Sequence, residues 1–337
     1  MIRPSFDKLF RVKSHLNYNR QMQLRGVFLF MTFVAAVSLT TATAQRPPAA
    51  SGARTLLLPR QIVSGERATL AVLDANGRLT PGVTVQFSNG DRFTTDVTGR
   101  ALFVAPLNPG VIFASIAGRS GRMPTVVLSP SEATTTAMEI SAAPSVASLT
   151  DRFELLGHGF CGDADANQVT IGDQPALVLA ASPAALVVLP PTELEAGTAT
   201  IQVGCAKRQA PDFSLTLVEL ELQADSSPLK PDEHRALTVR VRGSAAKVPL
   251  EARNLAPGIA ELAGGNPVRV SSTGGSENVA RFHLTGRKNG SFAISIRLVP
   301  SLTRPHARSS PQPARQPAEN FVSVLIPEET ITHSFWR

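Results

Sequence analysis

Short stretches of alternating apolar and polar residues, separated by turn dipeptides, constrain the fold of this chain more than any other feature. In the stretch 83–87 (VTVQF), for example, apolar residues alternate with polar ones, and the dipeptides Pro81-Gly82 and Asn89-Gly90 flank it. A side-chain period of two indicates a β-strand with one buried face, and Asn and Gly tolerate the positive φ of tight turns. No long stretch with helical periodicity appears, so an all-β fold is predicted.

The alternating strands group into three successive blocks of about 80 residues, a common size for a β-sandwich domain. The blocks span residues 54–129, 134–217 and 220–300. They are not near-identical in sequence, so we expect tandem immunoglobulin-like β-sandwiches rather than a solenoid. Almost no linker separates the blocks, and neighbouring domains are therefore expected to touch.

The first 44 residues resemble a secretory signal peptide. Basic residues end at Arg25, a 14-residue apolar run follows, and Ala42-Thr43-Ala44 precedes Gln45 as an A-x-A cleavage pattern. The basic lead-in is long, and translation from Met22 would make the signal compact. The apolar run is shorter than the ~20 residues of a membrane-spanning helix. Cleavage between Ala44 and Gln45 is predicted, with an uncleaved N-terminal membrane anchor as the alternative.

The basic net charge does not indicate nucleic-acid binding. Six of the 33 basic residues and one of the 26 acidic residues lie before Gln45, so the remainder has 27 basic against 25 acidic residues. A nucleic-acid-binding protein needs a clustered basic surface. We therefore expect no nucleic-acid partner.

The middle block carries the most diagnostic motifs. Its successive elements are L156-G-H-G-F160, V169-T-I-G172, S182 followed by L186-V-V-L-P-P191, and G197 followed by A199-T-I-Q-V203. In this order they resemble the IPT/TIG family of Ig-like domains over essentially the whole block. The resemblance implies an Ig-like sandwich used for binding or spacing, and the signal segment favours the extracellular members.

The two outer blocks resemble bacterial Ig-like modules of surface proteins. In the first block the similarity rests on the stretch 81–87 (PGVTVQF) and on 95–103 (TDVTGRALF). In the third block, Val and Ile alternate with Arg and Thr, as in a sandwich sheet with one wet face. A bacterial source is implied by these resemblances alone.

The two cysteines, Cys161 and Cys205, both fall in the middle block. An even number of cysteines in a secreted protein favours a disulfide, so a structural bridge is predicted. A redox or nucleophilic thiol is the alternative, but there is no C-x-x-C spacing, and only His158 lies nearby.

The segment 163–167 (DADAN) begins like a calcium-binding loop. Such a loop then needs a glycine at its sharp turn and a glutamate at its twelfth position. This chain has Gln168 and Gln174 instead, with Asp173 one residue early. A solvated Asp/Asn turn is therefore the preferred interpretation, and no metal site is predicted.

No catalytic motif stands out. The histidines after Gln45 form no H-x-x-x-H or H-E-x-x-H pair, and there is no G-x-S-x-G elbow or glycine-rich phosphate loop. We predict a protein that is not an enzyme, without a cofactor. Those histidines are His158, His234, His283, His306 and His333.

Residues 301–320 are rich in Pro and Arg and are predicted to be a flexible linker, followed by a C-terminal tail, 321–337. The stretch 321–325 (FVSVL) alternates and is a candidate strand that docks on the third block.

Together these patterns predict a non-catalytic secreted or cell-envelope protein that mediates protein or surface interactions. The expected partner is a protein or envelope component, with polysaccharide as a second class. The alternative is an accessory carbohydrate-binding or spacer component of an extracellular polysaccharide-acting enzyme system. Residues 45–337 contain no Tyr and a single Trp, Trp336, which weakens the case for an aromatic sugar platform. Periplasm, cell surface and exterior stay open as locations.

Overall fold

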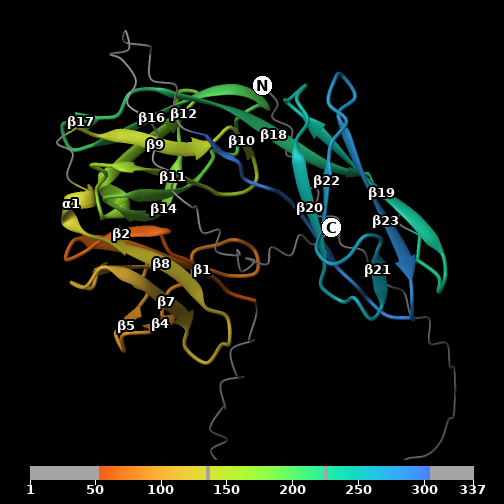
Figure 1. The fold of residues 1–337 in the computed structure, drawn as a ribbon, viewed down its shortest axis with the longest axis horizontal. Helices are drawn as coiled ribbons and strands as arrows, with labels where there is room; N and C mark the ends of the chain where they lie inside the picture. The colour runs from red at the N-terminus through yellow and green to blue at the C-terminus, as the bar shows by residue number, and fades with distance from the viewer. Residues whose placement is uncertain (1–52, 134–136, 224–226, 304–337) are drawn as a thin grey trace, which may run out of the picture. The chain divides into compact units, whose positions relative to one another are not determined.

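The computed structural model describes residues 53–133, 137–223 and 227–303 (Figure 1). These residues form β-strands, one four-residue helix α1 (Pro130–Ala133) and one 3-10 turn η1 (Ala164–Ala166). The prediction of an all-β chain of tandem Ig-like sandwiches is confirmed. The predicted signal segment with Ala44 and Gln45, and residues 304–337, lie outside the described residues.

The first sandwich, orange to yellow in Figure 1, has two sheets that enclose one apolar core. One sheet orders its strands β2-β8-β7-β4-β5, and in the other β3 lies between β1 and β6. In β4 every second residue is buried, as its alternation predicts. The strands are β1 (Thr55–Leu57), β2 (Gln61–Val63), β3 (Arg67–Leu73), β4 (Thr84–Phe87), β5 (Arg92–Thr94), β6 (Arg100–Val104), β7 (Gly110–Ile116) and β8 (Met123–Leu128).

Strand β3 differs from the half-buried strand that its alternation suggests. All six residues from Ala68 to Leu73 are buried. Leu70 and Val72 pack into the core of the first sandwich, while Ala71 and Leu73 pack into a second apolar cluster with residues of the middle sandwich. Both faces of β3 are therefore covered, one of them by the neighbouring domain.

The second sandwich, yellow to green in Figure 1, surrounds the largest of the apolar clusters. Its sheets follow the orders β14-β15-β11-β9 and β13-β12-β16-β18. Its strands are β9 (Glu139–Pro144), β10 (Val146–Ser148), β11 (Phe153–His158), β12 (Asn167–Ile171), β13 (Gln174–Pro175), β14 (Leu177–Ser182), β15 (Ala185–Leu189), β16 (Gly197–Cys205), β17 (Arg208–Gln209) and β18 (Phe213–Gln223).

The third sandwich, teal to blue in Figure 1, pairs the sheet β18-β19-β23-β21 with the three-stranded sheet β22-β20-β24. Its core contains Leu237, Val239, Leu250 and Phe282. The strands that follow β18 are β19 (His234–Arg242), β20 (Pro249–Asn254), β21 (Ala260–Leu262), β22 (Val268–Ser271), β23 (Val279–Gly286) and β24 (Ile294–Leu298).

Strand β18 belongs to two sandwiches at once. Residues 213–217 pair with β16 of the second sandwich, and residues 219–223 pair with β19 of the third. Leu217 is accordingly buried in the second core and Val218, the next residue, in the third. Because successive side chains of a strand point to opposite faces, one uninterrupted strand contributes to both cores.

The predicted flexible linker 301–320 needs a correction at its start. Leu302 and Thr303 form β25 (Leu302–Thr303), which pairs with Pro144 and Ala143 of β9. Ser145 also donates its N–H to the carbonyl of Ser301. The chain therefore leaves the third sandwich and binds to the edge of the second before residue 304. Leu302 and Thr303 pair with backbone groups on the edge of β9 that would otherwise have no strand beside them.

Within the part of the chain that the structure describes, no helix is long and apolar enough to cross a membrane.

Candidate functional site

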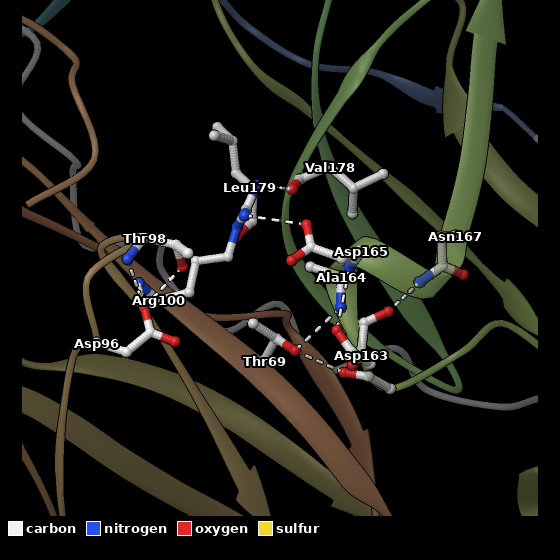
Figure 2. A network of polar contacts seen from close by, with 11 residues as sticks. Thr69, Asp96, Thr98, Arg100, Asp163, Ala164, Asp165, Asn167, Val178 and Leu179 are labelled. Atoms are coloured by element: carbon white, nitrogen blue, oxygen red, sulfur yellow. Dashed lines mark hydrogen bonds and ion pairs between the residues drawn. The ribbon is translucent and has the colours of Figure 1, made fainter. Parts of the chain in front are cut away.

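A network of polar contacts lies where the first two sandwiches meet, around the buried side chain of Arg100 (Figure 2). Arg100 begins β6, and its side chain is only 9% exposed. Its Nη2 donates to the carbonyl of Val178 at 2.7 Å, and its Nε donates to the carbonyl of Leu179 at 3.2 Å. Nη1 forms an ion pair with Asp165 Oδ1 at 3.1 Å. One side chain of the first sandwich thus satisfies two backbone carbonyls and a carboxylate of the second.

A tight turn in the first sandwich sets the position of Arg100. Asp96 Oδ1 accepts hydrogen bonds from the Thr98 N–H at 2.8 Å and the Thr98 hydroxyl at 2.6 Å. The Thr98 hydroxyl is the main reason that the pKa of Asp96 lies below its usual value, an effect that outweighs burial. Gly99 has a φ of +78°, and a Cβ there would lie 2.5 Å from the backbone nitrogen of Thr80. The turn therefore requires glycine immediately before Arg100.

On the opposite side, the DADAN segment forms a structural turn. Asp163 caps η1 by accepting from the N–H of Asp165, and the Asn167 amide donates to the carbonyls of Cys161 and Asp163 at 2.8 Å. The Asp165 carboxylate is bonded to Arg100. No group of His, Cys, Asp and Glu among the described residues has a geometry suited to a metal ion.

Thr69 of β3 links the same turn to the first sandwich. Its hydroxyl donates to the carbonyl of Gly162 at 2.8 Å and accepts from the N–H of Ala164 at 3.1 Å. Gly162 approaches so closely that a Cβ there would lie 1.8 Å from the carbonyl oxygen of Arg67. Backbone of the two sandwiches is in contact at this point, and any larger residue would separate them.

A disulfide between Cys161 and Cys205 anchors the turn from within the second sandwich, with 5.9 Å between the two Cα atoms. Cys205 ends β16 and pairs in register with Asn167 at the start of β12. The bridge therefore fixes the beginning of the segment that carries Asp165.

Apolar packing accompanies the polar contacts at this junction. Thr69 of β3 pairs with Ala181 of β14, so the sheets of the two sandwiches join. Around that point a cluster of buried residues from both domains forms, comprising Leu57, Ala71, Leu73, Leu179, Ala180 and Val187. Ser182, the fully buried last residue of β14, donates its hydroxyl to the carbonyl of Gln61.

None of the junction hydrogen bonds or ion pairs given above involves a histidine. His158 of β11 is half-buried, and its Nδ1 is buried without a hydrogen-bond partner among the described residues. His234 Nδ1 lies 2.9 Å from the Thr285 hydroxyl on the exposed side of β19, and His283 is exposed on β23. His306 and His333 fall outside the described residues.

The first sandwich presents an apolar row to solvent. On β7, Ala114 and Ile116 point into the core, so Val111 and Phe113 point outward, and they are 49% and 42% exposed. Their partners on β8 are Val126, which is half-buried, and Pro124, which is exposed. We call these four residues the β7–β8 row. A cleft of about 390 Å³ adjoins Phe113, and Gln86, Ser88, Ser115 and Arg122 also line it.

A second cleft, of about 420 Å³, lies on the third sandwich and is lined by residues 240–245 with Gly275 and Ser276. Arg240 and Arg242 are its only titratable lining residues, so the cleft offers no acid–base pair.

No family model and no curated protein matches this chain. Among solved structures, the Bacteroides ovatus mixed-linkage glucan utilization locus protein SGBP-B, in complex with a mixed-linkage heptasaccharide, is similar at 12% identity. The match covers 71% of this chain and 72% of that protein, with a TM-score of 0.31. The plexin A4 extracellular region is similar at 13% identity over 75% of this chain, with a TM-score of 0.26; the chain spans 24% of it.

The Yersinia pseudotuberculosis adhesin InvE is similar at 12% identity, over 73% of this chain and 55% of that protein, with a TM-score of 0.20. We draw no functional conclusion from similarity at this level.

The residues of the junction were only partly foreseeable. The sequence pointed to Asp163, Asp165 and the two cysteines, and the structure brings all four into one region. The sequence did not single out Arg100, whose only signal is a charge directly before the alternation of β6. Two of the three partners of Arg100 are backbone carbonyls 78 and 79 residues away, and no side-chain pattern marks them.

Proposed function

We propose that this chain is a secreted, non-catalytic component of a bacterial cell envelope, which binds a protein partner and spaces it through joined Ig-like modules. The middle module is proposed to be of the IPT/TIG type. Its role in the proposal is to join the two outer modules.

One observation carries this proposal: both junctions between sandwiches are built from buried, bonded groups. Arg100 and the apolar cluster join the first to the second, and β18 joins the second to the third. Burying a guanidinium costs free energy unless all of its partners are in place. Domains that only needed to be linked would not require such a group at their contact. A protein that transmits position from one end to the other benefits from such contacts.

The proposed contact surface for the partner is the β7–β8 row. Singly exposed apolar residues are common on soluble proteins, but four adjacent apolar residues on one sheet face, three of them exposed, are a candidate contact surface. Phe113 is the aromatic residue of this row. The neighbouring cleft supplies the polar side chains of Gln86, Ser88 and Arg122. An apolar centre with a polar rim is the usual composition of a protein interface.

The test begins with location. Sequencing of the N-terminus of the native protein is expected to give Gln45 as the first residue. Protease treatment of intact cells that produce the chain then shows whether the protein is accessible from outside. Retention of the purified mature chain on envelope protein is then compared between wild type and the variant Phe113→Ser. A matched control is Leu177→Ser, because Leu177 is a similarly exposed apolar residue of the second sandwich.

We expect Phe113→Ser to lose retention and Leu177→Ser to keep it. Absence of retention in the wild type would reject the proposal. Retention on insoluble polysaccharide, in the absence of envelope protein, would favour the accessory role in a polysaccharide-acting enzyme system. Turnover by the purified chain, with or without metals, would support an enzyme.

A further inference from the structure

Within the residues that the structure describes, the third sandwich has one strand fewer in its second sheet than the first two sandwiches have. A seven-stranded Ig sandwich places strands A, B, E and D in one sheet and C, F and G in the other, so that G pairs with F. In the first sandwich β7 lies between β4 and β8, and in the second β16 lies between β12 and β18. In the first sandwich β8 follows F and occupies the position of G, and in the second β17 and β18 follow F and pair with it in that position.

In the third sandwich the corresponding sheet ends at F. Strand β24 follows β23 and pairs with β20, as F pairs with C, and within the described residues nothing pairs with its other edge. The next strand, β25, pairs with β9 of the second sandwich instead. The position of G is therefore unfilled by residues 53–133, 137–223 and 227–303.

The backbone groups on the open edge can be assigned. Leu255 donates its N–H to the carbonyl of Ala293, and Val299 donates to the carbonyl of Pro249. Antiparallel ladders alternate, so the odd-numbered residues of β24 face β20. The N–H and C=O groups of the even-numbered residues, Ile294, Ile296 and Leu298, point away from β20 along the open edge.

The side chains on this strand show the same incompleteness. The inward-facing residues of the F strand are buried in the second sandwich, where Ile201 and Val203 are fully covered. In β24 the inward-facing Ile294, Ile296 and Leu298 pack against the third core but stay partly exposed. A further strand would cover them and satisfy the edge.

We propose that residues 321–326 (FVSVLI) of this same chain form the missing G strand, antiparallel to β24. Val322, Val324 and Ile326 alternate on one side, which suits the apolar inner face, and Pro327 follows directly. A proline ends pairing because it has no N–H. The strand closes an edge that would otherwise be open to a second copy of the protein.

The chain is long enough for this return. Thr303 follows Leu298 by five residues, so the two lie at most ~17 Å apart. The 17 residues 304–320 can span up to about 56 Å when extended, which is more than three times that distance. The short detour through β25 therefore does not prevent residue 321 from reaching the beginning of the open edge beside Leu298.

The test is amide hydrogen exchange, resolved to single residues, on the full mature chain. In the wild type we expect the N–H groups of Ile294, Ile296 and Leu298 to be protected. The variant Val324→Asp, which places a charge on the inner face, is expected to speed their exchange by roughly tenfold or more, because local opening becomes easier. The matched control Ser323→Asp places the same charge on the outer face and leaves their exchange unchanged.

Two further measurements keep the test decisive. A chain that ends at Thr303 is expected to lose protection at Ile296, and a peptide of residues 320–327 is expected to restore it. The amides of Ser295 and Arg297, which face β20, stay protected throughout. Equal exchange in the wild type and both variants would overturn the proposal. Protection that rises with protein concentration would also overturn it, since a second copy would then fill the edge. Neither result depends on retention by the envelope.

Discussion

Arg100 and Asp165 form an ion pair in which only one partner is buried. Arg100 Nη1 lies 3.1 Å from Asp165 Oδ1, yet the side chains are 9% and 71% exposed. An ion pair with a solvated partner contributes about 0–1 kcal/mol, whereas a buried acceptor that loses its donor costs about 1–3 kcal/mol. The carbonyls of Val178 and Leu179 therefore account for more of the role of Arg100 than its acidic partner does.

The first prediction separates these two contributions. Arg100→Met is expected to lower the free energy of unfolding at the junction by about 2–4 kcal/mol, because two buried carbonyls lose their donors. Asp165→Asn is expected to cost less than about 1 kcal/mol. Amide exchange at Thr69 and Ala181, which pair across the junction, measures both effects. The control is Arg92→Met, an exposed arginine of β5. Equal losses for Arg100→Met and Asp165→Asn would show that the carbonyls do not dominate.

The second prediction concerns the contact at Gly162. In Gly162→Ala the new Cβ would lie 1.8 Å from the Arg67 carbonyl oxygen, so backbone on one side must move. We expect a loss of about 1–3 kcal/mol, the usual cost of overpacking, with faster exchange at Ala181. Gly121→Ala is the matched control, because a Cβ there meets nothing within 4 Å. Equal stability of the two variants by urea unfolding would show that the junction is loose.

The third prediction concerns the disulfide. The double variant Cys161→Ala with Cys205→Ala is expected to lose about 3–4 kcal/mol, the chain-entropy value for a loop of this length. The two cysteines are separated by 44 positions. Thermal unfolding with and without a thiol reductant checks this result. Reductant should destabilise the wild type and leave the double variant unaffected, and an effect on neither protein would mean that the bridge does not form.

The fourth prediction concerns pH and Glu251 of β20. Its carboxylate is 2% exposed and accepts from Arg269 at 2.8 Å and Arg297 at 2.7 Å, on the neighbouring strands. Burial raises the pKa of Glu251, but the hydrogen bonds from the two arginines outweigh it and hold the pKa below its usual value. A lowered folded pKa stabilises the protein above the unfolded value of about 4.3, and this contribution is lost as pH falls through the folded value.

Glu251→Gln removes that contribution. We expect wild type to exceed the variant in stability at pH 7, with the difference shrinking below about pH 4. Urea unfolding of the third sandwich between about pH 3 and pH 7 measures the difference. Glu261→Gln breaks the exposed pair with Arg287 and serves as the control, with little effect at any pH. A difference for Glu251→Gln that does not change with pH would exclude this role of the carboxylate.

Much of the architecture is local and could be predicted. Alternation at positions 83–87 predicted β4, and the glycine turns predicted its limits, because side-chain period and positive φ are properties of neighbouring residues. The bridge between Cys161 and Cys205 was predictable because the chain has only one possible pair of cysteines. Gln168 and Gln174, in place of the glycine and glutamate of a calcium loop, argued against such a loop at Asp163, where the structure has a capped turn.

Sequence alone left the joining of the sandwiches undecided. Arg100 donates to carbonyls of residues 178 and 179, β3 is covered on both faces, and Leu302 and Thr303 return to β9 instead of starting a free linker. Each of these depends on groups brought together by the fold from distant parts of the chain. Local alternation carries the information for a strand and its core face, whereas backbone carbonyls and open edges become partners only once the domains are packed.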